Sequence, residues 1–260
     1  MDSKIKKSYG IAICRNGKDG PEIFMCRKRV TYEFNEFVYG KYDDRNKIYL
    51  LVNNMTHQEK NVILTFNFDR MWYQLTLEEP SIGVTFSQQC KRKFENTFHG
   101  DMKEYLIDVI SVSKDGYKIW EIPKGRPNSW EKPLDTAIRE VSEESHFTPN
   151  HFKFIFHKKY VFTTIDYGVT YRMYYFMAKF NEDQHFLSRG IDWHHEEIDQ
   201  VKWWSLNDIE KNINNHHTNI KDYFNFVKMI INDFKHDDIE ESLQASYEEH
   251  IDIDQCCPRF

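Results

Sequence analysis

The stretch of sequence that decides the fold is GRPNSWEKPLDTAIREVSEESHF, residues 125–147. Apolar residues recur in it at helical spacing and would form one stripe along a helix: Leu134, Ala137, Ile138 and Val141. Glu140, Glu143 and Glu144 fall at i, i+3 and i+4, so they gather on a second face. The sequence therefore predicts an amphipathic helix with one buried side and one strongly acidic side.

The acidic side has two interpretations. Like charges at these spacings repel by a few tenths of a kcal/mol per pair, and nothing within the helix compensates. The simpler interpretation is a surface helix whose solvent side happens to be acidic. The other is a cation site, because clustered carboxylate oxygens are the ligands that Mg²⁺ and Mn²⁺ prefer.

The spacing beyond the helix favours the cation site. The whole stretch resembles the Nudix box, Gly-x5-Glu-x7-Arg-Glu-U-x-Glu-Glu-x-Gly-U, where U is aliphatic or aromatic. Every fixed position matches except the second glycine, which is His146 here. That glycine usually ends the helix in a left-handed conformation, which costs a residue with a Cβ roughly 1 kcal/mol. Histidine tolerates this region better than most residues, and Thr148 and Pro149 stop the helix anyway. We expect an altered helix end with its carboxylates intact.

Composition bounds the class of protein. The 260 residues are 40% hydrophobic and 16% aromatic, enough for a globular chain with one large or two small domains. No apolar run approaches the ~20 residues that span a bilayer, and the start does not resemble a signal peptide. The five cysteines show no Cys-x-x-Cys pairing, so they predict neither zinc nor a disulfide framework. We expect an intracellular, cytoplasmic protein.

Net charge limits how the chain could bind nucleic acid. A formal charge of −6 argues against binding by bulk charge, which needs Lys and Arg to neutralise phosphates. Any contact with RNA must come from a local basic patch.

The remaining chain predicts a discontinuous domain. Residues 8–14 and 22–28 read as a strand hairpin, and residues 35–116 as helical segments rich in aromatics. Within these, Thr56 and Glu59 have capping-box spacing, and Lys114-Asp115-Gly116 predicts a return turn.

Further strands are expected after the return turn, and helices close the chain. The expected strands are residues 118–123, 152–162, 170–180 and 196–204; the expected helices start near residue 205 and cover residues 223–234. Together with the box, they imply an α/β (α+β) fold, a Nudix α-β-α sandwich with a mixed sheet. We expect a Nudix domain from residues 1–34 and 117–235, an inserted helical domain from 35–116, and a loosely held acidic tail from 236–260.

Three segments narrow the resemblance within the Nudix family. Residues 120–125, WEIPKG, resemble the segment that leads into the box in mRNA-decapping Nudix enzymes. Residues 53–56, NNMT, and 68–73, FDRMWY, look like segments of the decapping Nudix hydrolases of large cytoplasmic DNA viruses, the African swine fever virus type. That group places a helical domain between the first strands and the box. The resemblance implies a viral enzyme that decaps mRNA in the host cytoplasm and takes part in host shutoff.

The resemblance also assigns roles in the box. Glu140 and Glu144 would be the main metal ligands, with the Gly125 backbone carbonyl completing the shell. Glu143 would be a third carboxylate ligand or the catalytic base. Arg139 would pair with Glu143 four residues later and hold its rotamer; this role is catalytic or purely structural, and we expect both to apply. A further box residue, Glu131, would brace the loop or serve as a weak ligand.

Residues flanking the box complete the expected site. Lys124 would meet a substrate phosphate, unless it is only a surface lysine. Decapping relatives also use an acid outside the box as a general base. Glu197 fits that position best, with Glu196 as the fallback, although either could equally be a solvated charge.

Substrate contacts are the least determined part of the site. A methylated guanine is a flat cation, so aromatic stacking is expected. The candidates are Trp72, Tyr73, Tyr167, Tyr171 and Trp193, most of which could simply be core residues. Basic triplets that could hold the RNA body are Lys91-Arg92-Lys93 and Arg27-Lys28-Arg29, unless they form an ordinary solvated face.

Three functions remain in competition. The leading one is an enzyme, dependent on Mg²⁺ or Mn²⁺, that cleaves the cap of capped mRNA to methylated GDP and 5′-monophosphate RNA. The second is a hydrolase of diphosphoinositol polyphosphates or dinucleoside polyphosphates that uses the same metal site. The third is a degenerate Nudix domain that only binds RNA, which would predict a damaged box.

Overall fold

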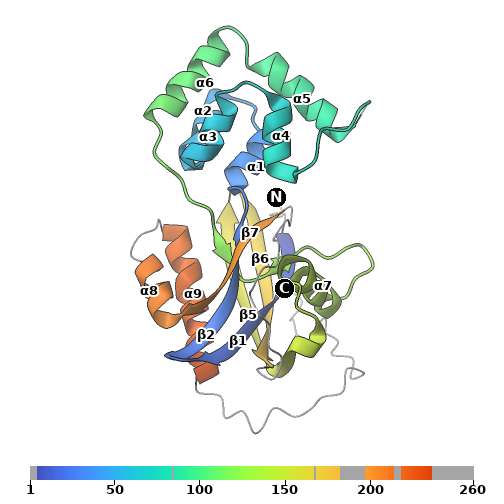
Figure 1. Ribbon diagram of the computed structural model, residues 1–260, viewed down its shortest axis with the longest axis vertical. Helices are drawn as coiled ribbons and strands as arrows, with labels where there is room; N and C mark the ends of the chain where they lie inside the picture. The colour runs from blue at the N-terminus through green and yellow to red at the C-terminus, as the bar shows by residue number, and fades with distance from the viewer. Residues whose placement is uncertain (1–4, 84, 167, 182–196, 214–217, 236–260) are drawn as a thin grey trace. The chain divides into compact units, whose positions relative to one another are not determined.

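The computed structural model describes residues 5–83, 85–166, 168–181, 197–213 and 218–235 (Figure 1). The chain divides into two compact units, which are described in turn. The first comprises residues 1–26, 121–191 and 201–260, and the second comprises residues 27–120 and 192–200.

A mixed sheet forms the centre of the first unit. Its strands are β1 (Ile5–Gly17), β2 (Gly20–Lys28), β3 (Trp120–Glu121), β4 (Lys124–Gly125), β5 (Phe152–Asp166), β6 (Val169–Phe180) and β7 (Ile198–Ser205). The strand order is β3-β2-β1-β6-β5, with β4 paired to β1 and β7 paired to β2. Because β1 runs parallel to β6 and antiparallel to β2 and β4, the sheet is mixed, as predicted.

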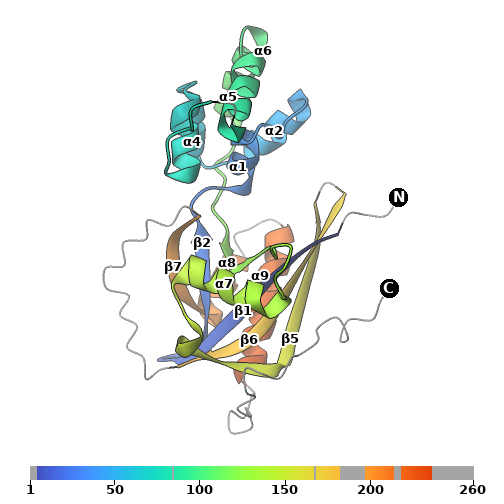
Figure 2. The same ribbon diagram turned by 90° about the vertical axis from the view of Figure 1, so that its right-hand side faces the viewer.

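Helices cover both faces of this sheet (Figure 2). On one face lies α7 (Pro133–Ser145), where Cys26 of β2 donates its thiol to the Glu144 carbonyl at 3.5 Å. On the other lie α8 (Leu206–Ile213) and α9 (Thr218–Lys235), where Phe226 packs on Tyr175 of β6 with ring centroids 5.7 Å apart. The predicted α-β-α sandwich is confirmed. A strand covered on both faces needs apolar side chains throughout, which explains the continuous apolar run in the middle of β1.

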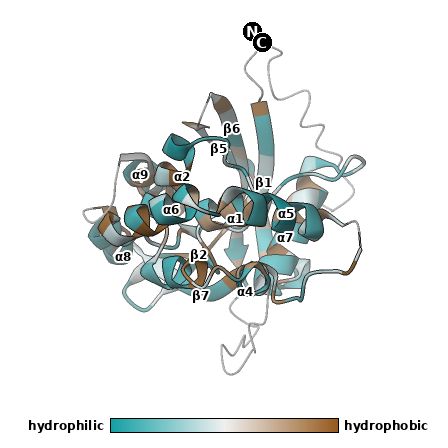
Figure 3. Ribbon diagram, turned by 90° about the horizontal axis from the view of Figure 1, so that it is seen from above, coloured by the Kyte–Doolittle hydropathy of each residue, from teal (hydrophilic) through white to brown (hydrophobic). Residues whose placement is uncertain are grey.

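The second unit contains the predicted helical segments. Its helices are α1 (Tyr32–Val38), α2 (Arg45–Asn54), α3 (His57–Ile63), α4 (Phe68–Thr76), α5 (Phe86–Thr97) and α6 (Asp101–Val112). Hydrophilic and hydrophobic residues alternate along them, as in helices with one buried face (Figure 3). The buried side is unusually aromatic, with Phe34, Phe37 and Phe94 all in one core.

Side chains at the start of α3 bind the segment before α1 and the segment after α6. Thr56 and Glu59 form the predicted capping box. The buried Glu59 carboxylate also accepts from the Thr31 N–H at 2.6 Å and from its hydroxyl at 3.0 Å. The neighbouring Lys60 donates to the Lys114 carbonyl, and burial lowers its pKa. Residues 114–119 contain no turn, helix or strand, so an irregular connection stands where the return turn was predicted.

The end of the box helix differs from expectation. His146 adopts φ 59° and ψ 11°, the left-handed conformation normally taken by glycine, so the helix end is not altered. Its N–H reaches the Ser142 carbonyl at 3.0 Å, a backbone bond that satisfies a carbonyl of the last turn. No helix among the described residues has both the length and the apolar character needed to cross a membrane.

Candidate active site

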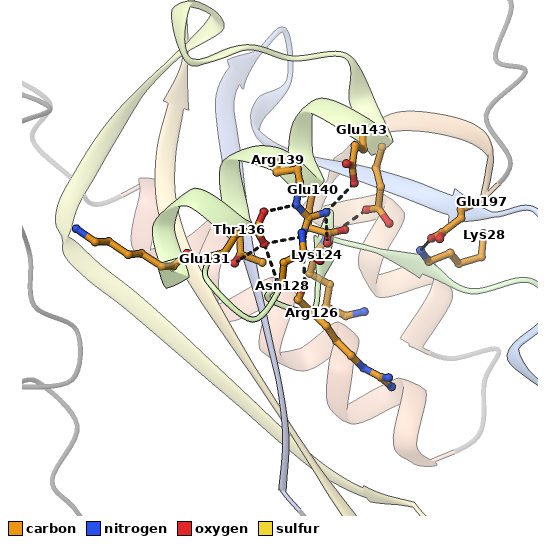
Figure 4. A network of polar contacts seen from close by, with 12 residues as sticks. Lys28, Lys124, Arg126, Asn128, Glu131, Thr136, Arg139, Glu140, Glu143 and Glu197 are labelled. Atoms are coloured by element: carbon orange, nitrogen blue, oxygen red, sulfur yellow. Dashed lines mark hydrogen bonds and ion pairs between the residues drawn. The ribbon is translucent and has the colours of Figure 1, made fainter.

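One arginine organises the acidic side of α7 (Figure 4). The Arg139 guanidinium contacts three carboxylates: Glu131 at 2.7 and 3.0 Å, Glu140 at 2.7 Å and Glu143 at 2.8 Å. The predicted pairing with Glu143 is therefore present in the structure. Since arginine presents several donors in a rigid fork, it fixes the rotamers of all three acids at once.

Glu131 ties the loop after Gly125 to the helix. Besides Arg139, its carboxylate accepts from the Asn128 N–H at 2.9 Å and the Thr136 hydroxyl at 3.2 Å. The Arg139 hydrogen bond, reinforced by Asn128, lowers the pKa of Glu131 to about 2. With its oxygens so occupied, Glu131 braces the loop.

Glu140 lies directly against the backbone of Gly125. A Cβ added at Gly125 would fall 1.9 Å from the Glu140 carboxyl carbon and 2.0 Å from one of its oxygens. Burial raises the pKa of Glu140 to about 7; Arg139 opposes this shift, and the charges of Glu144 and Glu143 add to it. Only a residue without a side chain fits between this carboxylate and the turn.

Glu144, which lies one helical turn after Glu140, contacts the same segment of backbone. It is 4% exposed, and its Oε2 accepts from the Lys124 N–H at 3.2 Å. The turn that carries Gly125 therefore lies against both predicted metal ligands of α7. The Lys124 ammonium itself is bound to the Glu121 carboxylate at 3.0 Å.

The donor set fits a hard divalent cation that is only partly ligated by protein. Among the described residues, no group of three or more His, Cys, Asp or Glu side chains forms a metal cage. Mg²⁺ is usually held by one or two carboxylates, water and substrate phosphates, so Glu140, Glu144 and the Gly125 carbonyl suffice. Burial is the main reason that the pKa of Glu140 is raised, and the charges of Glu144 and Glu143 add to it; a bound cation would stabilise the ionised carboxylate against both. Glu143 has a 51% exposed side chain held by Arg139.

The predicted general base lies in the other compact unit. Glu197 pairs with Lys28 at 3.1 Å, and its side chain is 66% exposed (Figure 4). The fallback, Glu196, lies outside the described residues. The role of Glu197 stays a prediction.

The predicted stacking residues are only partly available. Trp72 packs among Tyr39, Phe68 and Phe86, whereas Tyr73 is 49% exposed. Tyr171 stacks under the Lys6 ammonium, 5.2 Å from its ring centroid. Tyr167 and Trp193 lie outside the described residues.

The predicted basic triplets are largely engaged in ion pairs. Lys91 pairs with Asp69 at 2.9 Å and Lys93 with Asp43 at 3.3 Å. Within the described part of the chain, the exposed Arg92 has no such pair. In the other triplet, Arg27 pairs with Asp199 at 2.8 Å and Lys28 with Glu197, while the Arg29 N–H donates to the Glu197 carbonyl at 2.7 Å.

Sequence reasoning missed three cations near the box. Arg126 is exposed and immediately follows Gly125, a position that could have been noticed from the sequence. Lys7 and Arg172 are register partners on the parallel strands β1 and β6, and among the described residues neither has an acidic partner. No sequence signal joins two residues so far apart, because strand register creates the pair.

Comparisons with known proteins find similar chains. The family model described as NUDIX domain matches residues 107–224. The mRNA-decapping protein g5R of African swine fever virus, isolate Warthog/Namibia, is 27% identical over 247 residues, which cover 90% of this chain and 100% of that protein. The g5R of isolate Pig/Kenya is 28% identical over the same length, again covering 90% and 100%.

Solved structures also match. A C. elegans Ap4A hydrolase binary complex aligns with a TM-score of 0.42 and 14% identity, covering 88% of this chain and 99% of that one. A Nudix hydrolase from M. smegmatis, RenU, aligns with a TM-score of 0.40 and 8% identity, covering 88% of each chain.

Proposed function

Since the chain belongs to the Nudix family of hydrolases, we propose that it is a metal-dependent mRNA-decapping enzyme. It cleaves the pyrophosphate bridge of the 5′ cap, releases m7GDP and leaves RNA with a 5′-monophosphate. The similarity to mRNA-decapping proteins supports this substrate, because it extends over 90% of the chain and therefore includes most of the helical segment. The Nudix domain is formed by residues 1–34 and 117–235, with residues 35–116 inserted as a helical domain. The proposed enzyme acts in the host cytoplasm.

One observation carries the chemistry: the Gly125 backbone lies against Glu140 while the adjacent Lys124 N–H binds Glu144. These groups would hold Mg²⁺ or Mn²⁺. Bound there, the cation would neutralise charge on the pyrophosphate oxygens and lower the pKa of a water molecule.

The other box residues prepare the attack on phosphorus. One carboxylate oxygen of Glu143 is paired with Arg139, while half of the side chain faces solvent. The carboxylate can therefore accept a proton from the attacking water. Arg139 holds that carboxylate in place, and Glu131 in turn fixes Arg139. Lys124 and the exposed Arg126 supply positive charge beside the turn for substrate phosphates. Glu197 is retained as an alternative base.

A strip on β1 and β6 supports a long anionic substrate. We call Tyr9, Tyr174, Lys7 and Arg172 the β1–β6 strip. Tyr9 is the register partner of both Gly125 and Tyr174, with the two tyrosine rings stacked 5.3 Å apart. Lys7 and Arg172 follow two residues further out, and alternate residues of a strand share one face. Tyr9 is buried and backs the half-buried Tyr174 ring, which together with the two cations suits a single-stranded nucleic acid that leaves the active site.

Cap-labelled RNA tests the proposal directly. The wild-type chain with Mg²⁺ or Mn²⁺ should release labelled m7GDP, and Glu144→Gln should abolish release. Glutamine keeps the acceptor for the Lys124 N–H but removes the charge, so this variant separates metal chemistry from folding. The proposal fails if no m7GDP appears at any concentration of either metal.

A small-molecule substrate is the alternative, since the same metal site would serve nucleotides or inositol pyrophosphates. RNA length discriminates: a decapping enzyme should cleave capped RNA better than free cap analogue, whereas a small-substrate enzyme should not. A degenerate RNA-binding module would turn over neither.

A further inference from the structure

Two helices hold the turn that leads to Gly125. The Ile122 N–H donates to the hydroxyl of Tyr223 on α9 at 2.9 Å, and the Lys124 N–H donates to Glu144 on α7 at 3.2 Å. Pro123, between them, has no N–H. Both backbone donors that precede Gly125 are therefore bound by side chains from outside the turn.

Tyr223 is itself held rigidly. It is 8% exposed, and its ring packs edge-on against Phe162 at 5.3 Å. Its hydroxyl lies 3.4 Å from that of Tyr175, which in turn donates to the Met173 sulfur at 3.7 Å. Because a thioether sulfur can only accept, Tyr175 is the donor to Met173, and either hydroxyl can be the donor between Tyr175 and Tyr223. Burial raises the pKa of Tyr223, so its hydroxyl stays neutral.

Strand β1 closes the remaining side of the turn. Gly125 and Lys124 pair with Tyr9 and Gly10 of β1. A Cβ at Gly10 would fall 2.2 Å from the Pro123 carbonyl oxygen, so the turn sits as close to this strand as a backbone can. While β1 and α7 hold the turn from two sides, Tyr223 holds it on the side of α9.

We propose that Tyr223 is a positioning residue for the metal site, acting through Ile122 on the turn that presents the Gly125 carbonyl. The inference rests on the proposed function, because it takes Gly125, Glu140 and Glu144 as the protein's metal donors. Without the Tyr223 hydroxyl, the Ile122 N–H is left buried without an acceptor. The turn then relaxes, and its carbonyl leaves the position facing Glu140 and Glu144. Groups that support metal ligands in this way typically change metal affinity by roughly 10–100-fold.

The test compares Tyr223→Phe with Tyr160→Phe. Tyr160 is a matched control: it is 9% exposed, its ring faces Phe226 of the same helix, and its hydroxyl binds Asp233 at 3.1 Å instead of the turn. Mn²⁺ affinity is measured by the electron paramagnetic resonance signal of free Mn²⁺. Amide hydrogen exchange of the metal-free proteins is followed over residues 119–126.

In Tyr223→Phe, we expect the Mn²⁺ dissociation constant to rise at least tenfold. Exchange of the amides of Ile122, Lys124 and Gly125 should quicken even without metal, and cleavage should recover towards the wild-type rate at saturating Mn²⁺. Tyr160→Phe should change none of these. Tyr175→Phe, which removes only the hydroxyl beside that of Tyr223, should show a smaller shift in the same direction.

Two outcomes would overturn the inference: Tyr223→Phe binding Mn²⁺ as wild type does, or both variants losing affinity equally. Either result leaves the proposed function standing if the wild-type chain still releases m7GDP. If the wild-type chain itself binds no Mn²⁺, the proposed metal site fails first, and unchanged exchange in Tyr223→Phe then overturns the positioning role as well.

Discussion

Replacing Gly125 with alanine should damage the site by a predictable amount. The new Cβ would lie 1.9 Å from the Glu140 carboxyl carbon, so that carboxylate must retreat by about 1.5 Å to reach the 3.4 Å at which ordinary contact begins. A misplacement of about 1 Å can cost roughly 100-fold in rate, or about 2.7 kcal/mol of transition-state stabilisation. Steady-state cleavage of cap-labelled RNA at saturating Mg²⁺ measures the loss.

A double-mutant cycle with Glu140→Ala identifies the cause. Overpacking should make Gly125→Ala less stable than wild type by about 1–3 kcal/mol in urea unfolding. In the Glu140→Ala background, the space is open and the same alanine should cost under about 1 kcal/mol. Wild-type kcat/KM in Gly125→Ala, or an equal loss of stability in both backgrounds, would refute the close approach of Gly125 and Glu140.

Three further predictions follow from named contacts. His146→Gly should raise the free energy of unfolding in urea by about 1 kcal/mol, because it relieves a left-handed residue; His146→Ala, which keeps a Cβ, should not. Glu131 has its pKa lowered to about 2 by Arg139, so its contribution to stability is complete above its ordinary pKa of 4.5 and is lost as pH falls through about 2. Unfolding free energy should therefore fall more steeply over this pH range in wild type than in Glu131→Gln, and parallel curves would disprove the pairing. Replacing Lys7 and Arg172 with alanine should raise KM for capped RNA and leave cleavage of free cap analogue unchanged. The salt dependence of RNA binding should fall by about two phosphate contacts. An equal effect on both substrates would exclude an RNA path along the β1–β6 strip.

Features encoded locally were predictable from the sequence. The box helix depends on residues three and four apart, so the apolar stripe, the acidic face and the pairing of Arg139 with Glu143 could be read directly. The capping box at Thr56 was equally local. The left-handed conformation of His146 was not foreseen, because a residue with a Cβ at the glycine position was expected to alter the helix end.

Features created by tertiary structure were beyond sequence reasoning. Lys91 is paired with Asp69, 22 residues away in the chain, so a triplet that looked available for RNA is partly neutralised. The bond from Ile122 to Tyr223 joins residues 101 positions apart. Such contacts depend on strand register and helix docking, which no local pattern specifies.

The central claim is that Glu140, Glu144 and the turn at Gly125 form one divalent-cation site. Titration of Mn²⁺ against the wild-type chain, Glu140→Gln and Glu144→Gln, followed by electron paramagnetic resonance, tests it most directly. We predict saturable binding to the wild-type chain and at least a tenfold weaker affinity in each variant. Equal affinity in all three proteins would contradict the claim.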